Sequence, residues 1–229
     1  MLKKSWFFVG GLVLVIGQVL AAGATELKSD KDKLSYSIGS SIGKNFKGDG
    51  TEIDTNLLME GLRSSLAGEK SLLPEKEVRQ IMNDYQTKLR QAANAKRQLA
   101  IADNKKKGDA FLADYKAQAG VVVAPNGLLY KIVKEGPGKK PVESDMVEVN
   151  YRGALINGTE FDATEPGKPA TLKVSALIPG WKQALSMMSI GSKWHIVIPP
   201  VLGYGERGVG SDIGPNEVLV FDLELVGIK

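Results

Sequence analysis

A stretch without glycine or proline, from Glu75 to Lys107, constrains the fold of this 229-residue chain more than any other feature. Pro74 stands where a helix can begin, and Glu75 and Glu77 place negative charge in the first turn, which favours the positive helix end. We predict one long connecting helix over residues 74–119, with a length on the order of 65 Å at 1.5 Å per residue. The chain is therefore divided into an N-terminal part and a C-terminal part.

Apolar and small side chains recur along this predicted helix at intervals of four and three residues, which is heptad spacing. The stripe weakens to alanine and lysine as it proceeds, through Val78, Met82, Tyr85, Leu89, Ala92, Lys96 and Leu99. We expect the helix to pack against other structure early and to become solvated later.

Residues 25–73 contain two short amphipathic segments separated by a turn-rich sequence at residues 47–50. Their apolar positions are spaced as one helix face, at Leu34, Ile38, Ile42, Phe46, Leu57, Leu58, Leu62 and Leu66. Neither helix can bury its stripe alone, and a unit of some 40 residues is small for an independent core. We predict a helical dimerisation region and a homodimer formed through residues 25–90.

The first 24 residues resemble a secretory signal peptide. Lys3 and Lys4 precede an apolar run at 6–20 and a small-residue stretch at 21–24. The alternative is a membrane anchor, but the run falls short of the roughly 20 apolar residues that a span needs. We predict cleavage after Ala24 and no membrane span afterwards. The expected location is the periplasm or cell envelope, with outer-membrane or surface association left open.

After Gly120 the sequence changes to short alternating segments separated by glycine, proline and asparagine, which is typical of strands. Apolar residues on one face mark strands at 128–132, 147–151, 196–198 and 219–225. One helical pattern begins at Pro179 and ends by Gly191. We predict an α+β fold in which residues 120–229 form an antiparallel β-sheet curled around one short helix.

Composition excludes several classes of site. The chain has no cysteine and a single histidine, His195, so thiol chemistry, disulfides and histidine-rich metal sites are ruled out. The formal net charge of +4 becomes +2 once Lys3 and Lys4 leave with the signal segment, which contains no acidic residue. That charge predicts no nucleic-acid partner. We predict no metal and no cofactor, and we place His195 on the surface or rim of the sheet.

Two short motifs suggest chemistry that their context does not support. Residues 39–43 match the nucleophile-elbow pattern but lie inside a helical repeat rather than at a strand-to-helix turn. Residues 203–208 match a dinucleotide fingerprint but are followed by a turn instead of a helix. Neither motif predicts an active site here.

Four segments of the C-terminal part, taken in order, closely resemble the FKBP-type peptidyl-prolyl isomerases. They are residues 147–153, 158–162, 177–181 and the run from Tyr204 to Phe221. The resemblance covers about residues 120–229. With the signal peptide and helices, the chain further resembles the exported bacterial branch that includes the macrophage infectivity potentiator (Mip) proteins.

The resemblance implies a pocket that binds the proline ring of polypeptide substrates, with Trp181 at its floor. The implied site residues are Tyr151, Phe161, Asp162, Leu177, Ile178, Trp181, Tyr204, Ile213 and Phe221. Aromatic walls suit an apolar ring. Family members also bind macrolide inhibitors, but Ala170 and Leu172 stand where many members carry phenylalanine, which bears on macrolide affinity and substrate preference.

The resulting hypothesis is a peptidyl-prolyl cis-trans isomerase acting on X–Pro bonds of exported proteins, without covalent or metal chemistry. Chaperone-like holding of clients by a dimer is expected beside that activity. The alternative is a non-enzymatic module that binds proline peptides at the cell surface and serves attachment or virulence. A proline cis-to-trans rate assay separates the two, because only the enzyme accelerates isomerisation.

Overall fold

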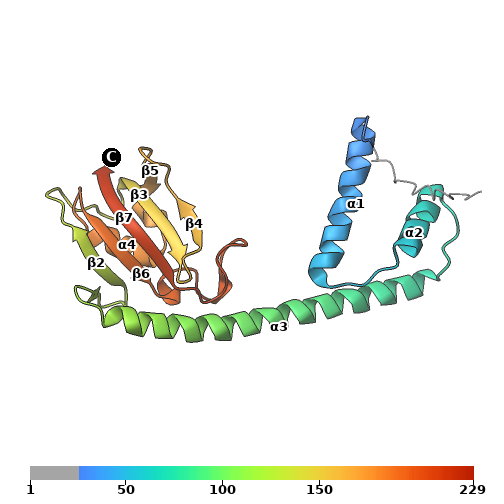
Figure 1. The fold of residues 1–229 in the computed structure, drawn as a ribbon, viewed down its shortest axis with the longest axis horizontal. Helices are drawn as coiled ribbons and strands as arrows, with labels where there is room; N and C mark the ends of the chain where they lie inside the picture. The colour runs from blue at the N-terminus through green and yellow to red at the C-terminus, as the bar shows by residue number, and fades with distance from the viewer. Residues whose placement is uncertain (1–25) are drawn as a thin grey trace, which may run out of the picture. The chain divides into compact units, whose positions relative to one another are not determined.

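The computed structural model describes residues 26–229, and the predicted signal peptide lies outside this range. The chain divides into two compact units, with the boundary between Glu75 and Lys76. The first unit is helical, and the second contains a long helix followed by an antiparallel sheet (Figure 1). The predicted fold class is therefore confirmed.

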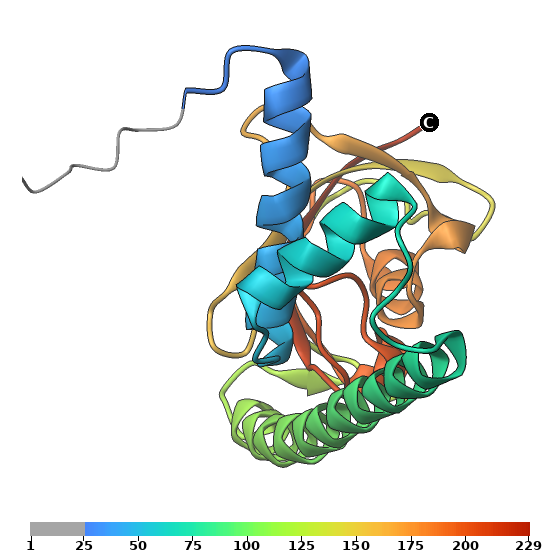
Figure 2. The same cartoon turned by 90° about the vertical axis from the view of Figure 1, so that its right-hand side faces the viewer.

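Two capped helices make up the described part of the first unit. Helix α1 (Asp30–Asp49) begins with Ser29 and Asp32 in a reciprocal capping box, and α2 (Thr55–Ala67) begins at Asp54, whose carboxylate accepts two backbone N–H bonds. Left-handed glycines end both helices. In the view of Figure 2, α2 runs obliquely across the front of α1. Neither helix buries a single residue within this chain.

Helix α3 (Glu75–Lys116) is the predicted long helix. Its packing differs from the expectation, because the residues it buries, Gly108 and Tyr115, lie near its end. The earlier residues Val78 and Met82 are exposed in the single chain. Leu99, late in the heptad stripe, is 73% exposed, as expected of a stripe that becomes solvated. The sequence did not predict the packing of the last turns, where Phe111, Leu112 and Tyr115 contact the sheet.

The sheet contains seven antiparallel strands in the order β1-β2-β6-β7-β3-β4, with β5 also paired to β3. Strands β3 and β7 form its centre and align Tyr151 with Leu223 and Gly153 with Phe221. The bounds of the seven strands are β1 (Val122–Val123), β2 (Leu129–Lys134), β3 (Met146–Leu155), β4 (Glu160–Ala163), β5 (Ala170–Lys173), β6 (Lys193–Ile198) and β7 (Leu219–Ile228).

Helices cover both faces of this sheet. Helix α4 (Pro179–Met187) packs on the inner face, where Trp181, Ala184 and Leu185 join the main core. The last turns of α3 pack on the outer face, where Tyr115 meets Val197 and other buried residues. The sequence predicted only the inner helix. Three one-turn 3₁₀ helices complete the fold: η1 (Val174–Ala176), η2 (Pro200–Leu202) and η3 (Gly205–Arg207).

Candidate functional site

A cavity of about 300 Å³ opens between the inner face of the sheet and the start of α4. Eight of the nine predicted site residues line it, together with Leu172 and Ala176. The sequence analysis named Leu172 only for its bearing on macrolide affinity and substrate preference, and it did not name Ala176. The eight are Tyr151, Phe161, Asp162, Leu177, Ile178, Trp181, Tyr204 and Phe221.

Ile213 is the predicted residue that does not line this cavity. Its side chain is buried in the main core, and its backbone forms a bridge with Val209 inside the loop before β7. Ile213 therefore supports the loop that carries Tyr204.

Four aromatic rings form the apolar wall of the site. Phe221 lies at their centre, with ring centroids 5.2 Å from Trp181 and 5.5 Å from Phe161, both at nearly perpendicular angles. Tyr151 meets Trp181 edge-on at 5.1 Å. Edge-to-face packing is a favoured arrangement of aromatic rings and holds the wall in a fixed shape.

Two glycines allow this close packing. A Cβ atom at Gly153 would lie 2.6 Å from the Phe221 ring and 2.8 Å from the Phe161 ring, so any side chain there would displace the wall. A Cβ atom at Gly180 would lie 2.6 Å from Ile198, so glycine lets the first turn of α4 approach the sheet. That approach places Trp181 at the bottom of the cavity.

The polar part of the site is a tyrosine–carboxylate pair. The Tyr151 hydroxyl donates a hydrogen bond of 2.7 Å to Oδ2 of Asp162 across neighbouring strands. Burial, reinforced by the hydrogen bond to Asp162, raises the pKa of the Tyr151 hydroxyl well above its ordinary value. Like any tyrosine, Tyr151 is a proton donor at neutral pH, and the raised pKa extends this into alkaline solution. Its hydrogen bond holds Asp162 at the rim.

Ile178 supplies a second polar feature. It is the N-cap residue of α4, and Pro179 follows at the first helical position. Its carbonyl accepts the N–H bonds of Trp181 and Lys182, while its own N–H has no acceptor among the described residues. An N–H free at a helix start can bind a carbonyl oxygen.

The remaining candidate motifs take no part in this cavity. Residues 39–43 lie inside α1, and residues 203–208 include η3 rather than the start of a long helix. His195 lies on the outer face, as predicted, but it is not free there. Its Nδ1 is 2.8 Å from Asp222, and its ring is 5.7 Å from that of Tyr115. Within residues 26–229 no cluster of three potential metal ligands occurs.

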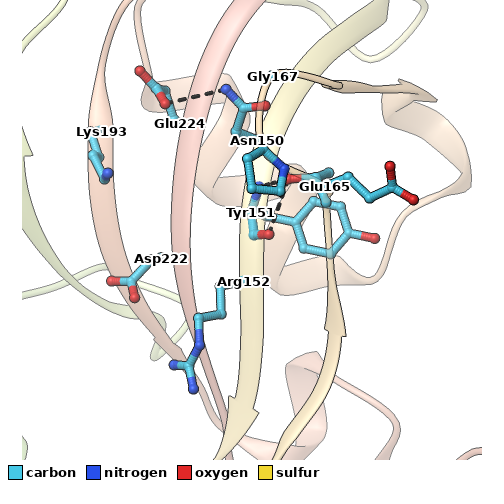
Figure 3. A pocket seen from close by; sticks show the side chains of 10 residues that line it. Asn150, Tyr151, Arg152, Glu165, Gly167, Lys193, Asp222 and Glu224 are labelled. Carbon is cyan, nitrogen blue, oxygen red and sulfur yellow. Dashed lines mark hydrogen bonds between the residues drawn. The ribbon is translucent and has the colours of Figure 1, made fainter.

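A second hollow of about 270 Å³ lies around the outward-facing side chains of β3, β6 and β7. Figure 3 shows that both signs of charge line it, with Arg152 and Lys193 near Asp222 and Glu224. Several of these groups are already paired, for example the Asn150 amide with Glu224 at 3.4 Å. Tyr151 is the one aromatic residue in its lining, so the hollow has no wall of several packed rings and does not resemble a proline pocket.

Known proteins match both parts of the chain. Residues 31–132 match the domain amino terminal to FKBP-type peptidyl-prolyl isomerase, and residues 138–226 match the FKBP-type peptidyl-prolyl cis-trans isomerase domain. The outer membrane protein MIP of Legionella longbeachae is 47% identical, over 91% of this chain and 90% of that protein. The peptidyl-prolyl cis-trans isomerase Mip of Coxiella burnetii is 40% identical, over 91% of each chain.

A solved structure supports the same assignment. The crystal structure of FkpA from Escherichia coli has a TM-score of 0.66 and 35% sequence identity, covering 89% of this chain and 99% of that one. Sequence similarity along almost the whole length therefore accompanies the shared fold. The chain belongs to the FKBP-type peptidyl-prolyl cis-trans isomerases.

Proposed function

We propose that the aromatic cavity is the isomerase site and that it binds the proline ring of an extended polypeptide. The observation that carries this proposal is the convergence of four aromatic rings, the Tyr151–Asp162 pair and the free Ile178 N–H on one cavity. The rings provide a stiff apolar surface for proline, and the N–H provides a donor for a substrate carbonyl. Trp181 forms the floor.

Catalysis at such a site needs no covalent step. Rotation about an X–Pro bond crosses a barrier of roughly 18–20 kcal/mol that arises from amide resonance. Moving the planar amide into an apolar cavity removes the water that stabilises its charge-separated resonance form. A donor placed for the twisted amide then binds the transition state better than either planar isomer. A 10⁵-fold acceleration would require about 7 kcal/mol of such differential binding.

Asp162 has a supporting role in this proposal. Its carboxylate accepts the Tyr151 hydroxyl bond and so fixes the ring that forms one wall of the cavity. Leu172 narrows the wall on the β5 side, where its size helps to select substrates. Macrolide inhibitors are expected to compete for the same cavity.

The test of the site compares Asp162→Ala with the matched control Asp114→Ala, which changes an exposed aspartate on α3. We expect the first variant to lower kcat/KM for a short proline peptide by about tenfold, equivalent to about 1.4 kcal/mol of transition-state stabilisation. The control should match the unaltered protein. Full activity in a folded Asp162→Ala variant would contradict the assignment of Asp162 to the site.

The helical unit supports a second part of the proposal, a homodimer through residues 25–90. A cavity of about 630 Å³ lies between α1 and α2, and its lining is mostly apolar, including Ile38, Ile42, Phe46, Leu58 and Leu62. A second copy of the same unit would cover these side chains. In a two-fold dimer the same apolar surface of each copy would face the other. Two linked isomerase sites would raise the effective concentration for a second contact on one client and so favour chaperone-like holding.

Replacing Ile42 with aspartate tests the dimer, because it places a charge in the proposed interface. Ser41→Asp is the matched control, since Ser41 is exposed and does not line the cavity. We expect Ile42→Asp to scatter light as a monomer, with unchanged activity on a short peptide and slower catalysis of proline-limited protein refolding. A monomeric unaltered protein, or equal refolding by all three proteins, would contradict the holding role.

Export is the third part of the proposal. The first 24 residues have the pattern of a cleaved signal peptide, and one relative is named an outer membrane protein. Within residues 26–229 no helix has the length and apolar character to cross a membrane. We infer that the mature enzyme acts on exported proteins in the cell envelope. Fractionation of cells, with N-terminal sequencing of the mature protein, tests both the location and the cleavage after Ala24.

A further inference from the structure

The segment between η2 and β7, residues 203–218, is here called the site loop because it carries Tyr204. It is closed on itself by internal hydrogen bonds. The Asn216 N–H donates to the Gly205 carbonyl at 2.8 Å, and the Val209 N–H donates to the Ile213 carbonyl at 2.9 Å. A loop closed in this way moves largely as one body, so the contacts near Gly205 and Asn216 set the position of Tyr204.

Helix α3 provides those contacts. Nη2 of Arg97 donates to the Glu206 carbonyl at 3.1 Å, and Nδ2 of Asn104 donates to the Pro215 carbonyl at 2.8 Å. In return, the Asn216 amide donates to the Ile101 carbonyl of α3 at 3.5 Å. Positions 97, 101 and 104 lie on one face of the helix. Helix α3 therefore contacts both sides of the point where the site loop closes.

The backbone at this junction is tightly constrained. A Cβ atom at Gly108 would lie 2.9 Å from Val218, so the helix approaches the end of the site loop more closely than a larger residue would allow. Asn216 has a φ of 55° and is the only residue other than glycine with a positive φ in the described part of the chain. Such a conformation persists where surrounding contacts hold it and tends to occur near functional sites.

We propose that Asn104 is a positioning residue of the isomerase, acting through the site loop on Tyr204. The proposal rests on the proposed site, because Tyr204 must contribute to substrate binding there. Asn104 is the central contact: it is partly buried, it makes the shortest of the three bonds described above, and it also hydrogen-bonds the Glu217 side chain of the site loop. Docking of α3 has a separate anchor in Phe111 and Tyr115 on the outer face, so loss of Asn104 leaves the helix in place.

The kinetic test compares Asn104→Ala with Asn94→Ala in the full chain. Asn94 is an exposed residue on the same helix and provides the same substitution without a contact to the loop. We expect Asn104→Ala to lower kcat/KM for a proline peptide by about 3- to 10-fold, the range of a residue that acts through an intermediate contact. Asn94→Ala should have no effect.

A double-variant cycle identifies the route of the effect. If Asn104 acts through Tyr204, Asn104→Ala should change kcat/KM by less than about twofold in a protein that already carries Tyr204→Ala, because coupled residues are non-additive. A full additional 3- to 10-fold loss in that background would show that Asn104 acts elsewhere and would overturn the proposal.

Amide hydrogen exchange provides a readout that is independent of activity. In Asn104→Ala, the Asn216 and Ile213 amides should exchange at least about tenfold faster, whereas the Leu223 amide at the centre of β7 should be unchanged. Unchanged exchange at Asn216 would overturn the proposal. If Tyr204→Ala alone retains full activity, the assignment of Tyr204 to the site fails, and the exchange rates still decide whether Asn104 holds the loop.

Discussion

The helical unit and the isomerase unit use similar apolar residues in opposite ways. In α1 and α2 the leucines are exposed, with Leu34 at 62% and Leu57 at 66%. In the sheet Leu219, Leu223 and Leu225 are completely buried. The strands find their partners within the same chain through long-range pairing, whereas two short helices do not enclose a core. Among the described residues, only the isomerase unit encloses a core within the single chain.

The difference has a thermodynamic consequence. A unit that buries its own core has a stability independent of protein concentration, whereas a unit that depends on a second copy gains stability by mass action. The two units should therefore respond differently to mutation, dilution and pH.

Trp181→Ala should produce the largest loss. The side chain is 4% exposed and contacts both Tyr151 and Phe221, so its removal leaves a cavity in the core and destroys the floor of the site. We expect the isomerase unit to lose roughly 3–5 kcal/mol of unfolding free energy and most of its activity. Near-ultraviolet circular dichroism during urea unfolding measures the first effect.

Leu57→Ala in the helical unit is the comparison for that variant. It should leave the aromatic signal of the isomerase unit unchanged, because Leu57 lies in α2 and outside the core. A loss of isomerase stability in Leu57→Ala as large as in Trp181→Ala would show that the two units do not fold separately.

Dilution should distinguish the units without any mutation. If the helical unit is dimeric, each tenfold dilution removes about 1.4 kcal/mol from its stability, whereas the isomerase unit is unaffected. Thermal unfolding followed at a helix wavelength should shift to lower temperature on dilution, and the aromatic signal should not. Two transitions whose temperatures are both independent of protein concentration would contradict a dimeric helical unit.

Periodicity was sufficient to predict much of the fold. The spacing of Leu34, Ile38 and Ile42 indicated α1, and the alternation of Leu219, Phe221 and Leu223 indicated β7, because each pattern reflects one face of one element. The site required more. Tyr151 and Trp181 are thirty residues apart, and their shared cavity followed from family resemblance rather than from local pattern.

The missed features are contacts between residues distant in sequence. Asn104 and Pro215 are 111 residues apart, and an asparagine on a helix surface gives no local signal of its partner. The docked face at the end of α3 was missed for a similar reason. Gly108 interrupts the apolar stripe there, although its lack of a side chain is what permits close contact with Val218.

Alkaline pH should weaken the isomerase unit through Tyr151. Its pKa is raised in the folded protein, so above the ordinary tyrosine pKa of about 10 the unfolded chain releases a proton that the folded protein retains. Stability therefore falls as pH rises through this range. Tyr151→Phe should make that fall shallower by at most about 1.4 kcal/mol per pH unit, and by less because water reaches the ring.

Urea unfolding at several pH values from neutral to strongly alkaline measures this slope. The variant also lacks the hydrogen bond to Asp162, which adds a constant offset at neutral pH and must be subtracted. If the unfolding free energy falls with pH at the same slope in the unaltered protein and in Tyr151→Phe, the folded protein does not retain the Tyr151 proton, and the raised pKa is wrong. Tyr115→Phe offers a second case, because burial and the charge of Asp222 also raise the pKa of Tyr115.

The smallest effect is expected at the outer hollow, which has nearly the volume of the aromatic cavity but a different lining. Lys193 stands at its edge on β6 and is exposed to water. Lys193→Gln removes its charge and keeps most of its length, so stability should change by less than about 0.5 kcal/mol, as for ordinary surface positions. Peptide isomerisation should be unchanged, because the packed aromatic rings that suit a proline ring lie in the other cavity and charged side chains dominate this hollow. A measurable fall in kcat/KM, with stability intact, would show that substrate extends across the sheet to its outer face and that the aromatic cavity is not the whole binding site.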